Sequence, residues 1–279
     1  MTAAPGASGA LFVVSTPIGN LADMTLRAIE TLRTVALVLA EDTRHSRKLL
    51  DHFQITTPLV SHHEHNEAKS TPPLVERMLR GESMALITDA GTPLVSDPGA
   101  RLVVASIAAG VRVIPIPGAS AVLAALVAAG IPADRFTFFG FLDRKGKDRQ
   151  QSILTIRGLG HAAVLYESPN RLADTLAALR DGGLRDRRAA VARELTKQFE
   201  ELRRGTVEEL ARYYADASPR GEIVIVIEGA THDAPTEESL RDRARALRAG
   251  GASARDVVAV LTEELGAARN VAYRLAHEP

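Results

Sequence analysis

Residues 84–120 contain two short apolar runs, and each run ends in a turn rich in glycine, proline and small polar residues. Met84–Thr88 leads into D-A-G-T-P-L-V-S-D-P-G (Asp89–Gly99), and Val111–Pro115 leads into a turn that ends in G-A-S at Ser120. In an open α/β sheet, such turns lie at the carboxyl ends of strands, where ligands bind. Turn residues and a helix cap explain one such loop. Two loops joined by one helix favour a ligand-binding site.

Apolar runs alternate with helical patterns through the first half of the chain. Strands that alternate with helices predict a parallel sheet whose faces are both covered. The predicted strands are Leu11–Ser15, Val35–Ala40, Met84–Thr88, Val111–Pro115 and Phe136–Phe139, and the predicted helices are Thr25–Arg33, Arg47–Phe53, Pro73–Arg80, Ala100–Ala109 and Ala119–Ala129.

The charged segment Leu142–Gln151 is the predicted boundary between two α/β domains, and Phe136–Phe139 is expected to close the first. The second half also alternates, and a strand pair around Arg193–Gly205 would make its sheet mixed. The predicted strands there are Ala162–Glu167, Ala189–Glu194, Glu200–Gly205 and Glu222–Glu228, and the predicted helices are Gln151–Arg157, Pro169–Leu179 and Val207–Tyr214.

Three helical patterns follow a second linker at Thr231–Pro235, namely Glu237–Arg248, Ala254–Glu264 and Ala267–Ala276. The last two have the proportions of a helix-turn-helix. A helical cap on the core and an appendage that contacts nucleic acid both remain open. The predicted domain organisation is a flexible start at residues 1–10, α/β domains at 11–141 and 142–232, and a helical region at 236–279.

Composition excludes several classes of function. The chain has no cysteine, so it has no disulfide, no Cys-ligated zinc and no thiol nucleophile. Without a membrane-length apolar run or a signal peptide, we expect a cytoplasmic protein with no membrane partner. Lys and Arg number 34, as do Asp and Glu, which argues against nonspecific binding to nucleic acid, DNA included. Residues 141–220 carry 16 basic and 12 acidic side chains, so a polyanion would prefer this part of the chain.

Common motifs for cofactors and metals are missing. The first predicted strand is not followed by G-x-G-x-x-G, and neither H-E-x-x-H nor G-x-S-x-G occurs. The H-H-E-H segment at His62–His65 contains zinc-ligand types. Adjacent side chains of an extended segment point in opposite directions, however, so they cannot all share one ion. We therefore predict no metal, and a polar loop on the substrate side instead.

Seven sequence blocks resemble the tetrapyrrole methylase superfamily, and they occur in the expected order and at compatible spacing. The E-D-T-R, H-E-H-N-E and R-E-L-T-K segments resemble its RNA-modifying branch. The blocks are S-T-P-I-G-N-L-A-D-M-T-L-R-A (Ser15–Ala28), L-A-E-D-T-R-H-S-R-K-L-L (Leu39–Leu50), H-E-H-N-E (His63–Glu67), T-D-A-G-T-P-L-V-S-D-P-G (Thr88–Gly99), P-I-P-G-A-S-A (Pro115–Ala121), Y-E-S-P-N-R-L (Tyr166–Leu172) and A-R-E-L-T-K-Q-F-E-E (Ala192–Glu201).

The resemblance implies two α/β domains with S-adenosyl-L-methionine in the cleft between them, and a C-terminal helical appendage. It also implies a homodimer that methylates a cytidine 2′-hydroxyl in 16S rRNA of the small ribosomal subunit. For three of the residues assigned to the cofactor, a structural role is the alternative: Pro17 and Gly19 would form a tight turn, and Tyr166 would be an aromatic residue of the core. The cofactor residues that the resemblance implies are Pro17, Gly19, Asp89, Ala90, Gly91, Thr92, Pro93, Ser96, Asp97, Pro117, Gly118, Ala119, Ser120, Leu165 and Tyr166.

A ribose hydroxyl must lose its proton to a base during or after attack. Glu41, Asp42, Asp97, Glu167 and Glu194 are candidates, and the sequence does not choose among them. Glu41, Asp42 and Asp97 are the expected catalytic residues. Helix N-capping by Asp42 and loop bracing by Asp97 remain open as structural roles.

Five residues are expected on the RNA side. Arg44, Arg193 and Lys197 lie in the matching blocks, so a role in contacting phosphates is favoured over the alternative of solvated surface or local ion pairs. His63 and Asn66 belong to the polar loop. Two other functions remain open: methylation of a tetrapyrrole carbon by a related small-molecule enzyme, and RNA binding without methyl transfer.

Overall fold

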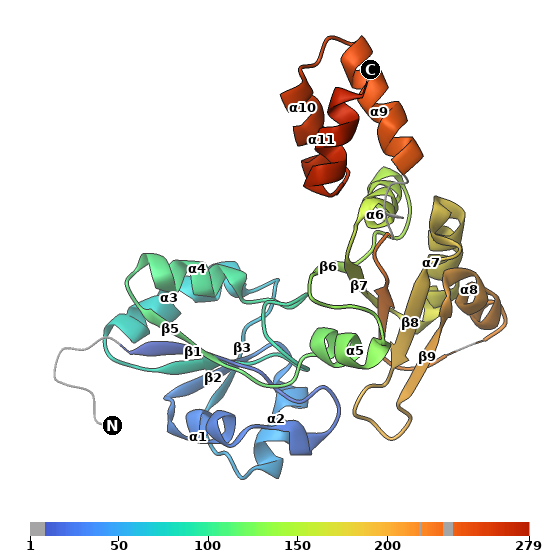
Figure 1. Cartoon of the computed structure of the whole chain (residues 1–279). Helices are drawn as coiled ribbons and strands as arrows, with labels where there is room; N and C mark the ends of the chain where they lie inside the picture. Colours follow the sequence, from blue (N-terminus) through green and yellow to red (C-terminus); the bar gives the residue numbers. More distant parts are fainter. Residues whose placement is uncertain (1–8, 218, 231–236, 279) are drawn as a thin grey trace. The chain divides into compact units, whose positions relative to one another are not determined.

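The computed structural model describes residues 9–217, 219–230 and 237–278. The described residues fall into two compact units, which belong to residues 1–229 and 230–279. Residues 1–8 of the predicted flexible start, and the whole predicted linker Thr231–Pro235, lie outside the described residues. The larger unit contains two five-stranded sheets (Figure 1).

The first sheet is parallel throughout, with strand order β3-β2-β4-β1-β5. Helices α1 and α2 bury one of its faces, and α3 and α4 bury the other, so the central strands are almost wholly apolar. The strands are β1 (Ala10–Val14), β2 (Leu37–Ala40), β3 (Leu59–Ser61), β4 (Met84–Leu86) and β5 (Arg112–Ile116), and the helices are α1 (Leu26–Thr34), α2 (Thr43–His52), α3 (Glu67–Leu79) and α4 (Ala100–Ala108).

The second sheet is mixed, as predicted, with strand order β6-β7-β10-β8-β9. Only the β6–β7 pair is parallel. Helices α6, α7 and α8 cover one face, and α5 covers the other. The strands are β6 (Phe136–Phe141), β7 (Ala162–Glu167), β8 (Arg188–Arg193), β9 (Glu201–Thr206) and β10 (Ile223–Ile227), and the helices are α5 (Ala121–Ala129), α6 (Lys147–Gly158), α7 (Leu172–Leu179) and α8 (Val207–Ala215), with short turns η2 (Pro169–Arg171) and η3 (Arg180–Leu184).

Helix α5 and strand β6 belong to the second sheet, not to the first as expected. Apolar residues of α5 pack on strands β7, β8 and β10, and β6 pairs with β7. The last carbonyls of α5 accept hydrogen bonds from that sheet, since Arg204 donates to Ala128 and Ala129 at 2.6 and 3.1 Å. Guanidinium groups satisfy the unpaired carbonyls at a helix C-terminus. The chain therefore leaves the first sheet after β5, before the predicted boundary.

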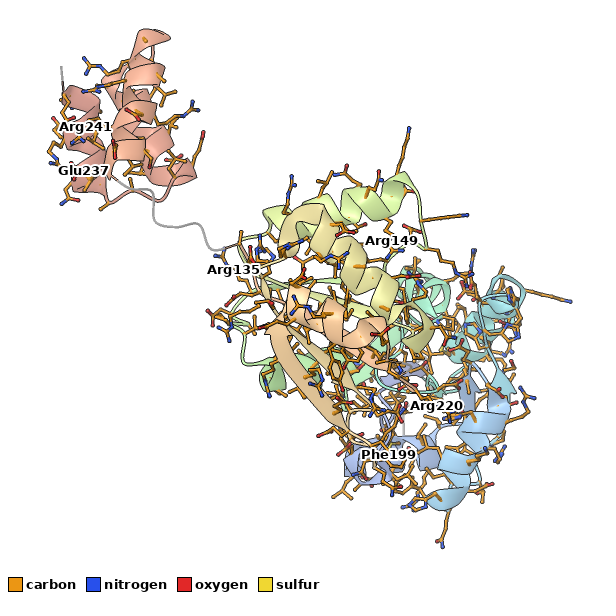
Figure 2. The ribbon with its side chains drawn as sticks, turned by 90° about the vertical axis from the view of Figure 1, so that its right-hand side faces the viewer. Arg135, Arg149, Phe199, Arg220, Glu237 and Arg241 are labelled. Carbon is orange, nitrogen blue, oxygen red and sulfur yellow. The ribbon has the colours of Figure 1, made fainter. Side chains whose placement is uncertain are left out.

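The smaller unit is a helical bundle with its own apolar core. Its helices are α9 (Glu237–Ala249), α10 (Ala254–Ala259), which continues as η4 (Val260–Glu264), and α11 (Arg269–His277). Leu240, Val257, Leu261 and Leu275 meet in the core. Arg241 forms ion pairs with Glu237 and Glu278 (Figure 2). The three predicted helical patterns are present. In the part of the chain that the structure describes, no helix has the length and apolar character needed to cross a membrane.

Gly99 gives a test of the packing beneath the β4–α4 loop. Its φ is +116°, and a Cβ there would lie 2.6 Å from Cδ2 of the buried Leu86. Gly110 also has a positive φ, +79°, but has open space around it. We expect Gly99→Ala to lower the free energy of unfolding in urea by about 1–3 kcal/mol more than Gly110→Ala, because overpacking adds to backbone strain. Equal losses in the two variants would contradict the tight contact.

Candidate functional site

Three loops at the carboxyl ends of β1, β4 and β5 are bonded to one another. Thr16 and Gly91 exchange two backbone hydrogen bonds, at 2.8 and 3.1 Å. The Thr92 hydroxyl lies 3.0 Å from the Ser15 hydroxyl and donates to the Ala119 carbonyl at 3.2 Å. The loop after β4 is thus bonded to the loops after β1 and β5, and together the three form one floor.

Two glycines allow these loops to approach closely. Gly91 has φ +81°, and a Cβ there would lie 3.3 Å from Cγ2 of Ile18. A Cβ at Gly118 would lie 3.0 Å from Cβ of Ser15. Side chains at these positions would separate the loops, so the close approach explains why glycine occupies both.

A cavity of about 430 Å³ lies between this floor and the second sheet. Its size is within the range typical of small-molecule sites. Its walls combine carboxylate and hydroxyl groups with apolar side chains, and no Lys, Arg or His among the described residues lines it. The lining residues are Ile18, Glu41, Asp89, Ala90, Gly91, Thr92, Val95, Ser96, Asp97, Ala121, Phe141, Tyr166, Glu167, Ser168, Pro169, Ala192, Leu195, Gly221, Glu222, Ile223 and Val224.

All five charged side chains that line the cavity are acidic. Burial raises the pKa of Glu41, and the nearby charges of Asp89 and Asp97 raise it further. Burial likewise raises the pKa of Asp97, and Asp89 and Glu222 add to that shift. Burial, Asp97 and Glu222 together raise the pKa of Tyr166 to about 12. Because Tyr166 belongs to β7 and Asp97 to the β4–α4 loop, the negative field spans both sheets.

Asp42 is engaged outside the cavity. It is the N-cap of α2, and its carboxylate accepts the Arg44 backbone N–H at 2.8 Å. The Arg44 guanidinium also pairs with it at 2.9 Å. Hydrogen bonds from the Arg44 side chain and backbone lower the pKa of Asp42 to about 2. The structure therefore supports the capping interpretation, because a carboxylate of such low pKa is a weak base.

Two other candidate bases are bound to neighbouring groups. The Glu167 carboxylate is buried, and it accepts hydrogen bonds from the Thr175 hydroxyl at 2.6 Å and the Ser168 N–H at 2.8 Å. Glu194 accepts a hydrogen bond from the Lys197 ammonium at 2.8 Å, and this hydrogen bond lowers the pKa of Glu194. Glu41 and Asp97 are thus the two candidates that line the cavity with raised pKa values.

Seven of the residues expected to contact the cofactor line the cavity: Asp89, Ala90, Gly91, Thr92, Ser96, Asp97 and Tyr166. The other eight do not: Pro17, Gly19, Pro93, Pro117, Gly118, Ala119, Ser120 and Leu165. Several of these hold the floor together instead, as Ala119 does for Thr92. The side chain of Leu165 is buried in the core on the opposite face of β7 from Tyr166.

None of the five residues expected on the RNA side lines the cavity itself, although Lys197 pairs with Glu222, which does. Arg44 is 90% exposed at α2, and Arg193 pairs with Glu201 at 3.1 Å. Lys197 pairs with Glu194 and Glu222 at 2.8 and 3.1 Å. A Cβ at Gly19 would lie 2.3 Å from Cγ of Lys197, so this lysine crosses between the two sheets.

The polar loop before α3 is held mainly by its own hydrogen bonds. The Asn66 side chain accepts the His63 N–H at 2.9 Å and donates to the Ser61 carbonyl at 3.1 Å, so its amide shapes the turn. His62 is buried with Nδ1 2.9 Å from the Ser70 hydroxyl. Among the residues with described positions, no group of three or more His, Cys, Asp or Glu is placed to hold a metal.

Sequence reasoning missed several residues of the cavity wall. Ile18 lies between the two residues chosen from its loop, and Glu222 precedes the apolar run of β10. Glu222 reaches the cavity because β10 pairs antiparallel with both β7 and β8, which places Ile223 opposite Glu167 and Arg193. No motif marks this pairing in the sequence.

Comparisons with known proteins agree with this architecture. The family model described as Tetrapyrrole (Corrin/Porphyrin) Methylases matches residues 10–211. A solved structure, uroporphyrin-III C-methyltransferase from Thermus thermophilus complexed with S-adenyl homocysteine, aligns with TM-score 0.57 and 16% identity over 79% of this chain and 97% of that one. The chain belongs to the tetrapyrrole methylase family, as predicted, and its enzyme class is methyltransferase.

Two curated relatives are more similar in sequence. One, from Synechocystis sp., is 47% identical over 97% of this chain and 98% of its own length. The other, from Mesorhizobium japonicum, is 51% identical over 78% of this chain and 74% of its own length. Both are named ribosomal RNA small subunit methyltransferase I. The predicted similarity to the RNA-modifying branch is confirmed.

The coupling of carboxylates in the cavity can be measured directly. We expect Asp97→Asn to lower the pKa of Glu41 toward the ordinary glutamate value, because it removes a negative charge that disfavours ionisation of Glu41. NMR titration of carbon-13-labelled glutamate side chains would report the shift. Glu76→Gln on the exposed surface of α3 is the control and should leave Glu41 unchanged. An unchanged Glu41 in Asp97→Asn would contradict the coupling.

Proposed function

We propose that the cavity binds S-adenosylmethionine. Three features support the fit: a volume suited to a small molecule, a floor of backbone groups that only glycine permits at Gly91, and carboxylates without a lining cation. A negative cavity favours a ligand that carries a sulfonium and an ammonium charge. Phe141 and Tyr166, with ring centroids 5.6 Å apart, add an aromatic wall against which adenine can pack.

We propose Glu41 or Asp97, and not Asp42, as the group that accepts the proton of the substrate hydroxyl. Bound S-adenosylmethionine would supply an electrophilic methyl group. Both candidate carboxylates line the cavity, and a raised pKa makes each a stronger base once ionised. Asp42 is occupied by α2 and Arg44.

We propose that the methyl acceptor is a cytidine 2′-hydroxyl of 16S rRNA in the small ribosomal subunit. The observation that carries this proposal is the near full-length similarity to relatives named ribosomal RNA small subunit methyltransferase I. The 2′-hydroxyl also distinguishes RNA from DNA. Phe199, 65% exposed after β8, offers an aromatic ring on which an unpaired base can stack (Figure 2). The acidic cavity disfavours the alternative, a carboxylated tetrapyrrole.

The activity is tested with isotopically labelled cofactor and small subunits from a strain that lacks this gene. We expect label in ribosomal RNA at a ribose, recovered as an alkali-resistant dinucleotide, because a 2′-O-methyl group blocks cleavage at that position. Subunits from a strain that carries the gene are the control and should accept little label. Label on a porphyrin precursor, or none on either substrate, would overturn the proposal.

The base is tested by three isosteric substitutions. Glu41→Gln or Asp97→Asn should lower kcat by about 10²-fold or more, whereas Asp42→Asn should keep kcat within about twofold because its carboxylate serves α2. The rate of the wild type should rise with pH until the base is ionised and then level off. Retained kcat in both Glu41→Gln and Asp97→Asn would rule out the assignment.

We also propose a homodimer. Apolar side chains are exposed on two helices of the larger unit, with Val104 67% and Ile107 61% exposed on α4 and Val127 85% exposed on α5. Exposed apolar side chains of this kind are common where a second copy binds.

Sedimentation velocity tests the dimer. The molar mass derived from the sedimentation of the wild type should be twice the 29.8 kDa mass of one chain. Val127→Glu should shift it toward the monomer, because a charge would be buried at the interface. Leu26→Glu on α1 is the matched control, since Leu26 is also 85% exposed. A wild-type monomer, or a dimer unaffected by Val127→Glu, would contradict this assignment.

A further inference from the structure

A second pocket, of about 350 Å³, adjoins the acidic cavity and has the opposite charge. The two share one lining residue, Ser168. The second pocket lies where the start of α6 meets η2 and α7. It is lined by Arg144, Arg149, Ser168, Asn170, Arg171 and Asp174. Three guanidinium groups and one exposed carboxylate give it a net positive charge.

Main-chain carbonyls, not carboxylates, hold the central arginine of this pocket. Arg149 donates to the Arg144 carbonyl at 2.6 Å and to the Asp174 carbonyl at 3.0 Å. These bonds fix the guanidinium without neutralising its charge. A fixed guanidinium whose charge no carboxylate of the described residues compensates is suited to an anion.

The other two arginines complete the pocket in different ways. Arg171 contacts the buried carboxylate of Glu167 at 3.3 Å and donates to the Leu142 carbonyl, so its position is also fixed. Arg144 is exposed, and no carboxylate of the described residues lies within ion-pair distance of its side chain or of that of Arg149. The pocket thus combines two fixed guanidinium groups with one free to close on a ligand.

An RNA substrate needs positively charged groups beside the acidic cavity. The cavity in which its ribose would react is lined by carboxylates, which repel the backbone phosphates on either side of that ribose. Phosphate contacts set the register of a nucleic acid on a protein. A positive pocket that shares Ser168 with the cavity can hold a phosphate beside the reacting nucleotide.

We propose that the pocket formed by Arg144, Arg149 and Arg171 binds a backbone phosphate of the RNA and so places the neighbouring ribose in the cavity. This inference rests on the proposed RNA substrate but names a site of its own. Arg149 and Arg171 form the fixed base, and Arg144 closes over the phosphate. The ligand class is a phosphodiester of single-stranded RNA.

The test uses the full chain and a fluorescent single-stranded oligocytidylate, with Kd measured by anisotropy across a range of salt concentrations. Arg144→Glu should raise Kd about tenfold and reduce the slope of log Kd against log salt by about 1. Arg144→Lys should recover much of the affinity. Arg27→Glu on α1 is the matched control, because it makes the same charge reversal on an exposed arginine of the other sheet, and should change neither value.

Methylation of small subunits is measured in parallel and separates the two proposals. If the wild type methylates ribosomal RNA, Arg144→Glu should raise KM while kcat and cofactor affinity stay unchanged. Methylation with no change of Kd, salt slope or KM in Arg144→Glu would overturn the phosphate pocket and leave the proposed function intact. A wild type that binds oligocytidylate through Arg144 but does not methylate RNA would overturn the proposed function and leave the phosphate pocket intact. A wild type that does not bind the oligonucleotide would also overturn the pocket.

Discussion

The backbone pairing of Thr16 with Gly91 is the interaction on which the candidate site depends. It joins the loops after β1 and β4, strands that are neighbours in the first sheet, and the Thr92 hydroxyl extends the connection to the loop after β5. Loops at strand ends are normally the most mobile part of an α/β protein. Here they satisfy one another's polar groups, so they form a wall against which a small molecule can be held.

Acidic and basic side chains occupy two separate but adjoining sites next to this wall. Carboxylates line the cavity, whereas arginines line the pocket that adjoins it at Ser168. A cationic methyl donor and an anionic acceptor have opposite electrostatic needs, and one uniformly charged cleft could not serve both. Under the proposed function, two adjoining compartments of opposite sign would attract each substrate to its own site.

The alternation of apolar runs and turns was enough to predict the parallel sheet and the loop from Asp89 to Gly99. It did not predict β3, which is only three residues long, or the start of α3 at Glu67, since Pro72 and Pro73 suggested a later beginning. Residue type could not separate a base from a helix cap at Asp42, because both roles use a carboxylate at a strand end. Glu222 was missed because strand pairing, not any local pattern, brings it to the cavity.

Helix α5 has a consequence for how a ligand enters. Its first residue, Ala121, lines the cavity, its body is packed on the second sheet, and its last carbonyls are bonded to Arg204. The floor formed by the loops of the first sheet is therefore anchored to the second sheet. Such anchoring limits hinge motion between the sheets, so little ordering entropy remains to be lost on association. We therefore expect the cavity to have its ligand-binding shape before the ligand enters, rather than to close around the ligand.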